Sequence, residues 1–491
     1  MSTNRTSATN RKPLITAAVC TFLFFLAVIY FVTYGVFVGL AIPLALFAVW
    51  MLIVKPELAL MVIAFCTPFA IDWEFFTKMN LSMPTEPLMI LFSVIFLVRL
   101  LLPNPPDSDK SQLSVVNYQF MKHPVTVAVL LATLWMLIVS ITSVIPWVSF
   151  KYLAARLWFI IPFYFAISQV FDNPKRIKQF LVCYGFGLAV VVIYSTIHTL
   201  QSPSDLQVLH RVMKPFYNDH TAYGAILSLF LPVFSYLAAS AKGRFRLFYI
   251  LCTLLFLVGL IFSYSRAAWL SVLCAVMVYF IVRFRIRWYW IAVALGIGVS
   301  LFFVNQTQIM YKMGKNQQDS ALDIGEQIQS ISNISTDASN LERLNRWACA
   351  FRIFGEHPVF GSGPGTYQHI YSRYQKSYQR STISTDFGDL GNAHSEYIGP
   401  LTEQGVPGAI FVLCIFGLTF ITGIRAYRMA PHEPLGKLAL ALTLSLTTYY
   451  VHGFFNNFLD TDKLSVPFWA LTAAIVAIEI KLKNEPSREI R

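Results

Sequence analysis

Long apolar runs separated by short polar turns dominate the chain and predict a bundle of membrane-spanning helices. A span requires about 20 mainly apolar residues, and the sequence contains about fourteen such runs. We expect spans at 14–31, 33–54, 57–72, 85–102, 124–145, 152–171, 178–199, 221–241, 246–264, 267–284, 287–305, 399–424, 435–455 and 463–482. The run 57–72 is short and contains Pro68, so twelve spans is the alternative count.

The composition agrees with this pattern and excludes a water-soluble globule. Apolar residues make up 56% of the chain and charged residues 13%, against about 45–50% and 25% in soluble domains. The mean hydropathy is +0.58. We therefore expect an all-α polytopic membrane protein in which residues 1–491 form a single membrane domain.

The basic residues predict how the helices are oriented, because short cytoplasmic loops carry the excess of Lys and Arg. On one side of the predicted topology lie Arg5, Arg11, Lys12, Lys175, Arg176, Lys178, Lys242, Arg244, Arg246, Arg283, Arg285, Arg287, Arg425, Arg428, Lys481, Lys483, Arg488 and Arg491. Both termini are thus predicted to be cytoplasmic, with 14–31 retained as a first span and not cleaved as a signal. The net charge of +13 is spread over many short loops, and this distribution argues against a nucleic-acid partner.

The opposite, outer side contains one long polar interval, residues 306–398. Within it, 341–354 has helical apolar spacing, and the Gly- and Pro-rich turn 357–366 is expected to end that helix. Smaller outer loops are expected near 70–84 and 200–220. The seven cysteines are scattered without CxxC spacing, so we predict neither disulfides nor a metal cluster.

Three outer-side residues are candidates for chemistry. Arg266 lies between two spans, where a guanidinium near the membrane either faces an anionic partner or extends to lipid phosphates. Arg343 lies on the predicted loop helix, where pairing with Glu342 or simple solvation is the alternative. His394 comes just before a predicted span and is either a general base or a structural hydrogen-bonding residue.

Two glycines follow His394 at a spacing close to whole helical turns. Gly405 is eleven residues on and Gly408 fourteen, so a continuous helix would bring all three to about one face. Gly399-Pro400 and Pro407 favour the alternative, a short interfacial helix that breaks before the span. In either arrangement the glycines permit close approach of neighbouring helices.

The segment from His394 to Gly408 resembles the signature of the O-antigen ligase family. That signature is His, then Asn, Ser or Gln, nine residues, and Gly-x-x-Gly, and His394, Ser395, Gly405 and Gly408 fit it without a gap. Ser265-Arg266 resembles a second element of the family. A third appears as Arg343, Trp347, Pro358, Gly361 and Gly363. The resemblance extends over about 210–455, while 1–200 is similar only in hydropathy.

This resemblance implies a GT-C-like membrane glycosyltransferase that uses an undecaprenyl-diphosphate-linked glycan as donor. The acceptor would be lipid A-core or another glycan, and the site would face the periplasm from the cytoplasmic (inner) membrane. Arg266 and Arg343 would bind the diphosphate, while His394 would deprotonate the acceptor hydroxyl. With no metal-site pattern on the outer side, the expected reaction is a metal-independent, inverting displacement that needs no cofactor.

Further outer-side residues are weaker candidates for substrate contacts. They are Arg211, Lys214, His220, Arg346 and His452. A solvated basic loop is the favoured explanation for the first three. Capping and interfacial hydrogen bonding explain His452 and its neighbours Asn456, Asn457 and Asp460 equally well. Tyr367, Tyr371, Tyr374 and Tyr378 form an aromatic stripe that would stack on sugars or anchor the loop to the membrane interface.

Other functions remain open at the level of the sequence. Within the resembled family, ligation to lipid A-core ranks first, ahead of polymerisation of a lipid-linked glycan and of protein O-oligosaccharide transfer. A polysaccharide or lipid-linked oligosaccharide transporter is the alternative from a different class. It is disfavoured because transporters carry charged residues deep in their spans, whereas here the polar residues gather at one surface.

Overall fold

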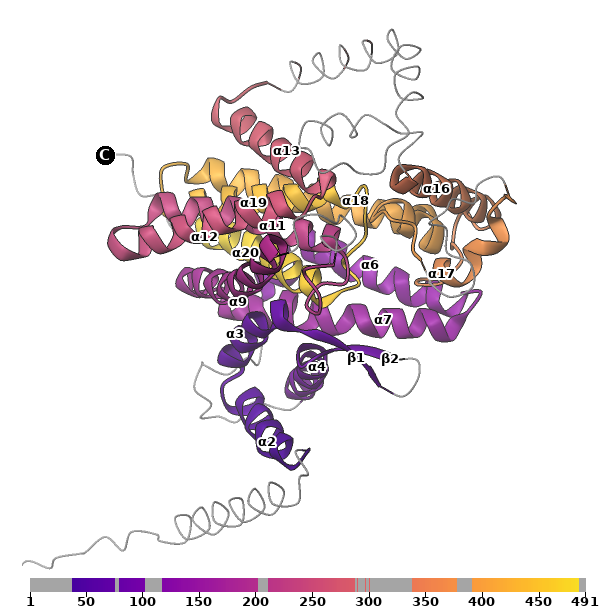
Figure 1. The fold of residues 1–491 in the computed structure, drawn as a ribbon, viewed down its shortest axis with the longest axis horizontal. Coiled ribbons are helices and arrows are strands. Elements are labelled where there is room, and N and C mark those ends of the chain that lie inside the picture. The colour runs from indigo at the N-terminus through magenta and orange to yellow at the C-terminus, as the bar shows by residue number, and fades with distance from the viewer. Residues whose placement is uncertain are drawn as a thin grey trace, which may run out of the picture. The chain divides into compact units, whose positions relative to one another are not determined.

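The computed structural model describes residues 38–75, 79–101, 117–201, 211–287, 338–377 and 391–484, with single residues 289, 296 and 300. The chain divides into two compact units, 1–59 and 60–491, and each is considered by itself. The first contains α2 (Val38–Val54) and the start of α3 (Pro56–Cys66). The second contains all the other described elements (Figure 1).

The second unit is helical apart from one hairpin. After α3 and a 3-10 turn (Thr67–Phe69) come β1 (Ile71–Phe75), β2 (Met79–Met83), α4 (Thr85–Leu101), α5 (Tyr118–Met121), α6 (Pro124–Ile141), α7 (Pro146–Ile160), a π-helical segment (Ile161–Ala166), α8 (Ile167–Val170) and α9 (Pro174–Gln201). They are followed by α11 (His220–Ser240), α12 (Gly243–Phe262), α13 (Arg266–Arg283), α16 (Ala338–Glu356), α17 (Tyr367–Ile370), a 3-10 turn (Tyr371–Tyr374), α18 (Ile398–Met429), α19 (Pro434–His452) and α20 (Asp462–Asn484).

The sequence explains where many of these helices begin. A proline is the first residue of α3, α6, α7, α9 and α19, because the first helical position needs no N–H donor and a fixed φ favours it. Asp219 precedes α11 and its carboxylate accepts a hydrogen bond from the Thr221 N–H at 2.9 Å. Asp462, in the first turn of α20, complements the positive end of the helix dipole.

Eight of the described helices are long and apolar enough to cross a membrane, which confirms the all-α polytopic fold. They are Pro124–Ile141, Pro146–Val170, Pro174–Gln201, His220–Ser240, Gly243–Phe262, Arg266–Arg283, Ile398–Met429 and Asp462–Asn484. Each overlaps a span predicted from the sequence. The predicted span 14–31 lies outside the described residues, as do most of the predicted span 287–305 and most of the polar interval 306–398.

The buried fraction distinguishes the central helix of the second unit, α20, from the peripheral helices. In α20, 89% of the most apolar window is buried inside the protein, against 22% in α12 and 17% in α13. Helix α18 packs against α6, α19 and α20, while α11 packs against α12, α13 and α19. The apolar side chains exposed on α12 and α13 are therefore the surface expected to face lipid.

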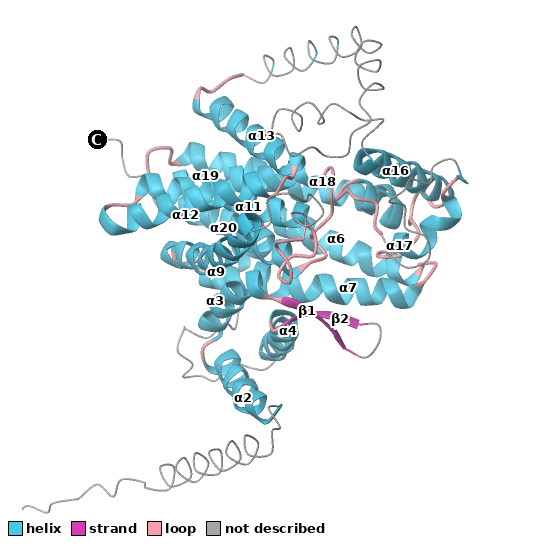
Figure 2. Ribbon diagram, in the orientation of Figure 1, coloured by secondary structure: helices cyan, strands magenta, loops and turns pink. Residues whose placement is uncertain are grey.

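The outer loop expected near 70–84 is instead a two-stranded antiparallel hairpin (Figure 2). Asp72 lies opposite Ser82 in the register, and the Ser82 hydroxyl donates to the Asp72 carboxylate at 2.6 Å. Such cross-strand pairs stabilise a sheet. The preceding helix stops at Cys66 because Pro68 cannot continue it.

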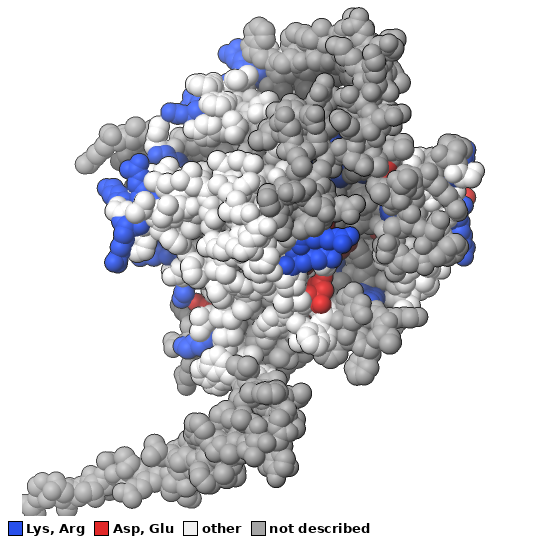
Figure 3. Space-filling model, in the orientation of Figure 1, with Lys and Arg blue, Asp and Glu red and all other residues white. Residues whose placement is uncertain are grey.

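Basic side chains gather at one end of the helices in the second unit. Figure 3 shows Lys and Arg along the left edge of the view, where α12 begins and α13 ends in Figure 1. At this end Arg425 and Lys483 both bind the buried carboxylate of Glu479, at 3.0 Å each. The segment containing His394 lies at the other end, before α18.

Candidate active site

His394 lies in a short non-helical segment immediately before α18. Its φ of +49° is in the left-handed region, which a residue other than glycine occupies only when its surroundings hold it there. The His394 N–H donates to Asn392 Oδ1 at 3.0 Å. The buried Ser395 hydroxyl accepts from the N–H groups of Tyr397 and Ile398, both at 3.3 Å, so Ser395 fixes the start of the helix.

The continuous helix that would align His394 with Gly405 and Gly408 does not form. Helix α18 begins at Ile398, and Gly405, with φ +70° and ψ −169°, divides it into two parts. The structure therefore agrees with the alternative prediction, a short helix that breaks before the span. His394 is positioned by the turn around Asn392 and not by a helical face.

Gly405 is required where the break in α18 meets the turn after α16. A Cβ added at Gly405 would lie 2.0 Å from the Val359 carbonyl oxygen, and one at Gly361 would lie 2.3 Å from the backbone of Glu403. The Val406 N–H donates to the Pro358 carbonyl at 3.0 Å, and the Gly363 N–H donates to the Glu403 carbonyl at 2.8 Å. These glycines let two backbones approach closely enough to share hydrogen bonds.

Gly408 has a more local role. A Cβ there would meet the Gln404 side chain at 2.3 Å, in the turn of α18 that contains the break. Gly408 also lines a cavity of about 70 Å³ with Gln404, Glu396 and Arg156. The second motif glycine thus provides space directly behind the His394 segment.

Two arginines of α16 lie close to His394. The Arg343 Nε donates to the Phe455 carbonyl at 3.2 Å. Arg346 is buried, pairs with Glu342 at 2.9 Å and donates to the Asn392 carbonyl at 3.1 Å. Arg346 therefore joins α16 to the His394 segment, whereas Arg343 reaches the loop after α19.

The charges around His394 favour its neutral form. Burial, together with the cationic Arg346 and Arg343, lowers the pKa of the imidazole to about 4. Asp219 and Glu342 oppose the shift without reversing it. At neutral pH the imidazole is therefore uncharged and able to accept a proton.

His452 lies close to the same charges, and its imidazole is fully buried. Arg343 and Asp219 are within electrostatic reach of it. Neither ring nitrogen has a hydrogen-bond partner among the described residues, and the same holds for Asn456 Nδ2 and Asn457 Oδ1. Buried polar atoms without partners are rare in native proteins, and each requires an explanation such as backbone strain, a catalytic role or a bound water or ion.

The loop before α11 contributes Asp219 to this group. The His220 imidazole lies 3.2 Å from the Asp219 carboxylate. Burial raises the pKa of Asp219, but hydrogen bonds from His220 and Thr221 outweigh this and lower it overall. Arg211 and Lys214 are exposed on the same loop.

Arg266 is the first residue of α13 and is half-buried. The turn before it packs on α11, because a Cβ added at Gly224 would lie 2.7 Å from Ser265 Cβ. Gly224 lies in α11, five residues after Asp219. The structure therefore brings Arg343, Arg346, His394, His452 and Asp219 together, and it places Arg266 beside α11 at the same end of the helices.

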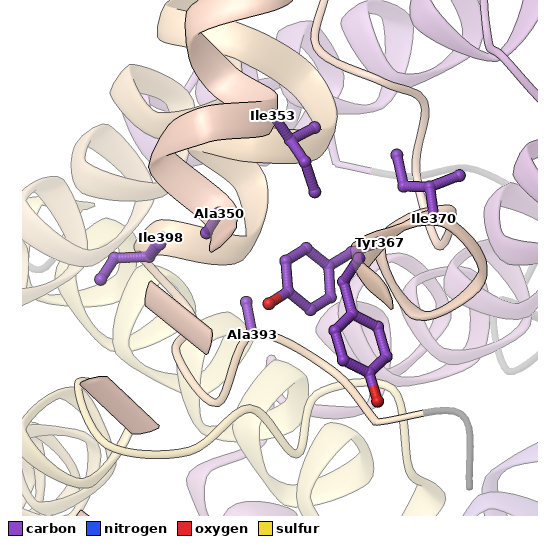
Figure 4. Packing of buried hydrophobic residues seen from close by; sticks show 7 residues of the cluster. Ala350, Ile353, Tyr367, Ile370, Ala393 and Ile398 are labelled. Atoms are coloured by element: carbon purple, nitrogen blue, oxygen red, sulfur yellow. The ribbon is translucent and has the colours of Figure 1, made fainter. Parts of the chain in front are cut away.

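The aromatic stripe of the polar interval is mainly a packing element. Tyr367 and Tyr371 are buried and stack with ring centroids 5.5 Å apart, and Figure 4 shows Tyr367 among Ala350, Ile353 and Ala393. The Tyr367 hydroxyl donates to the Arg346 carbonyl at 2.8 Å. These two rings support α16, so the membrane anchor and the sugar platform proposed for them are wrong. Tyr378 lies outside the described residues.

The three motifs that resemble a known family all lie within one segment of the chain, and that segment matches a family model. Residues 251–413 match the O-antigen ligase family model. The match contains Arg266, Arg343, His394, Gly405 and Gly408, and it confirms the resemblance over these residues. No curated protein sequence matches the chain.

The matched segment also contains a buried carboxylate, Glu396, that the sequence patterns did not single out. Glu396 Oε1 accepts hydrogen bonds from the Tyr449 hydroxyl at 2.6 Å and from the N–H groups of Phe458 and Leu459 at 2.9 Å each. The Glu396 N–H donates to the Gly453 carbonyl at 2.7 Å. Glu396 thus ties the His394 segment to the 453–461 loop, and a carboxylate at the edge of a predicted span was the available signal.

A second carboxylate in the matched segment that the sequence patterns did not single out is Glu403. Its side chain accepts from the N–H groups of Gly365 and Tyr367, at 2.9 Å each. It therefore fixes the Gly-rich turn to α18. Among the described residues, no group of three or more His, Cys, Asp or Glu side chains has the arrangement of a metal site.

Proposed function

We propose that this protein transfers a glycan from undecaprenyl diphosphate to an acceptor hydroxyl at the periplasmic face of the cytoplasmic membrane. The family match supports a membrane glycosyltransferase of the O-antigen ligase and polymerase type. The observation that carries the proposal is the position of His394 beside Arg343 and Arg346, of which Arg346 donates to the Asn392 carbonyl at 3.1 Å. A base and a cationic anion-binding group are what this transfer requires.

In the proposed reaction His394 takes the proton of the acceptor hydroxyl as its oxygen attacks the anomeric carbon. The bond from that carbon to the diphosphate oxygen breaks, and the negative charge grows on the leaving diphosphate. Arg343 and Arg266 stabilise that charge with planar, permanently ionised groups. A single displacement of this kind inverts the anomeric configuration and needs no metal ion.

The acceptor is proposed to bind at the 453–461 loop. The unpartnered polar atoms of His452, Asn456 and Asn457 support this assignment, because sugar hydroxyls both donate and accept hydrogen bonds. Exposed Arg211 and Lys214 would contact the donor from the α11 side. The acceptor ranked first is lipid A-core oligosaccharide, which makes the reaction O-antigen ligation in lipopolysaccharide biosynthesis.

Complementation of a gene deletion tests this function. Ligation predicts that the deletion removes glycan-capped lipid A-core from gels and leaves lipid-linked polymer to accumulate. The wild-type gene should restore the capped product and His394→Ala should not, since general base catalysis contributes about 10²–10⁴-fold. His369→Ala, an exposed histidine of α17, is the matched control and should complement.

Two other outcomes would change the assignment. Loss of long chains with a single repeat still attached to lipid A-core would identify a polymerase. Near-normal product from His394→Ala, expressed at the wild-type level, would remove His394 from the reaction.

A further inference from the structure

A groove lies between α11, α13 and α19, at the end of the helices opposite to His394. Its volume is about 560 Å³, within the range of small-molecule sites. Pro232 of α11, Val276 of α13 and Leu444 of α19 are among the apolar side chains that line it. The small side chains of Ala275 and Ala441 leave room in its floor.

The length of the groove corresponds to one leaflet of a bilayer. Along α13 the lining extends from Val272 to Arg283, a rise of about 16 Å at 1.5 Å per residue. The hydrocarbon core of a bilayer is about 30 Å thick, so one leaflet occupies about half of that. The groove is therefore long enough for one acyl chain, running from the C-terminal end of α13 toward the middle of the helices.

The end of the groove at the C-terminus of α13 is basic. Arg283, at the end of α13, lines it together with His432 and Lys437, from the turn and first residues of α19. All three side chains are exposed, and none has a hydrogen bond or ion pair to the rest of the described chain. The described lining contains no Asp or Glu.

We propose that this groove binds an anionic phospholipid from the leaflet at the basic end of the helices. One acyl chain lies against α11, α13 and α19, and the phosphate binds Arg283 and Lys437. Guanidinium and ammonium groups bind phosphate oxygens through charge-assisted hydrogen bonds, and basic pockets between membrane helices are suited to anionic headgroups. This lipid site is separate from the transferase site and does not depend on the proposed reaction.

Native mass spectrometry of the full-length protein, titrated with phosphatidylglycerol or phosphatidylcholine, tests the proposal. We expect the wild-type protein to retain phosphatidylglycerol preferentially. The double variant R283Q/K437Q should bind it about 10–30-fold more weakly, because each basic residue near an anionic headgroup contributes about a fivefold factor. R244Q/R246Q removes two charges from the same end, at the start of α12 and outside the groove, and should bind as the wild type does.

A variant that fills the groove distinguishes binding of the acyl chain from binding of the headgroup. Val276→Trp keeps both cations, and Val276 is 45% exposed, so the larger side chain occupies the groove without entering the core. It should also lose phosphatidylglycerol. Circular dichroism and thermal unfolding verify that each variant is folded.

Three results would overturn the proposal. The first is equal retention of the two lipids by the wild-type protein, and the second is unchanged phosphatidylglycerol binding by R283Q/K437Q. The third is a disulfide between Ala441→Cys and Val293→Cys, which would assign the groove to the chain's own predicted span 287–305. If the protein shows the expected lipid preference but no transferase activity, the proposed function fails and the proposed lipid site is still supported.

Discussion

The chemistry of His394 is set by its neighbours more than by its own position in the chain. Asn392 holds its backbone in the left-handed region, and Arg346 joins that segment to α16. Burial and the two guanidinium groups together keep the imidazole neutral. A base with a lowered pKa is weaker, but it is available at every pH above that value.

The first prediction concerns the pH dependence of transfer. Because the pKa of His394 is lowered to about 4, the acid limb of kcat/KM should lie near that pH and not near the value of about 6.5 for a free imidazole. Arg343→Gln removes a charge that lowers the pKa, so the limb should move to higher pH. A wild-type limb near 6.5 would contradict the assignment of the base.

The same shift affects stability. The unfolded chain binds a proton at His394 more readily than the folded chain does, so folding favours the neutral imidazole. The stabilising contribution is complete above about pH 6.5, and it is lost as the pH falls toward 4. Thermal unfolding measured across this range, in the wild type and in His394→Asn, isolates this contribution.

Glu396 provides a third prediction at the residue scale. Glu396→Ala leaves the N–H groups of Phe458 and Leu459 without their acceptor, and each unsatisfied buried group costs about 1–3 kcal/mol. Glu396→Gln keeps an acceptor oxygen and should cost less. Because Glu396 positions the 453–461 loop, we expect Gln to raise KM for the acceptor more than for the donor. Equal changes for both substrates would argue against a positioning role.

At the scale of elements, the contact between α18 and the turn after α16 determines where His394 lies. This joint consists of Gly405 and Val406 of α18 against Pro358 and Val359 of the turn. The joint depends on a helix break at Gly405 and on backbone hydrogen bonds across it. A regular helix would leave no donor or acceptor free for the turn. The break is therefore what allows a loop helix to dock onto a spanning helix.

Gly405→Ala tests this joint. Alanine is disfavoured at φ +70°, and its Cβ would lie within 2.0 Å of the Val359 carbonyl oxygen, so strain of about 1–3 kcal/mol is added to a steric clash. Gly417→Ala is the matched control in the same helix, where a Cβ meets nothing within 4 Å. It should stabilise the helix by up to about 1 kcal/mol. Unfolding temperatures in detergent should therefore change in opposite directions.

The sequence predicted the elements better than it predicted the links between them. Hydropathy located α6, α9, α11, α13 and α20 within a few residues, because a span must bury its backbone polar groups within one apolar helix. The β1–β2 hairpin was missed, since its stability depends on pairing with a second strand. The π-helical segment at Ile161–Ala166 was also missed, although Pro162 within it removes a helical donor.

At the scale of the whole molecule, the proposed orientation puts the basic helix ends in the cytoplasm and His394 in the periplasm. Single cysteines in a variant lacking the seven native ones test it in intact cells. Ser377→Cys, after the 3-10 turn, should react with a membrane-impermeant maleimide, and Ser240→Cys, at the end of α11, should not. Both positions are exposed, so the reverse pattern would invert the proposed topology.

Only part of the candidate site could be predicted from the chain. His394, Arg343 and the glycines follow from motif spacing, and the structure brings Arg343 and His394 into electrostatic contact. Asp219 and Glu396 were not predicted as members of the site, because their partners are remote in the sequence. A single sequence does not encode such pairings locally.

The framework around His394 is built largely from main-chain atoms. Hydrogen bonds of main-chain groups hold together the His394 segment with α18, the turn after α16 and the 453–461 loop. The groups are those of Pro358, Val406, Gly453, Phe458 and Leu459. Because almost every residue type carries these groups, side chains at several of these positions can be exchanged while the imidazole stays in place. The 453–461 loop is therefore the natural region in which to engineer a new acceptor preference.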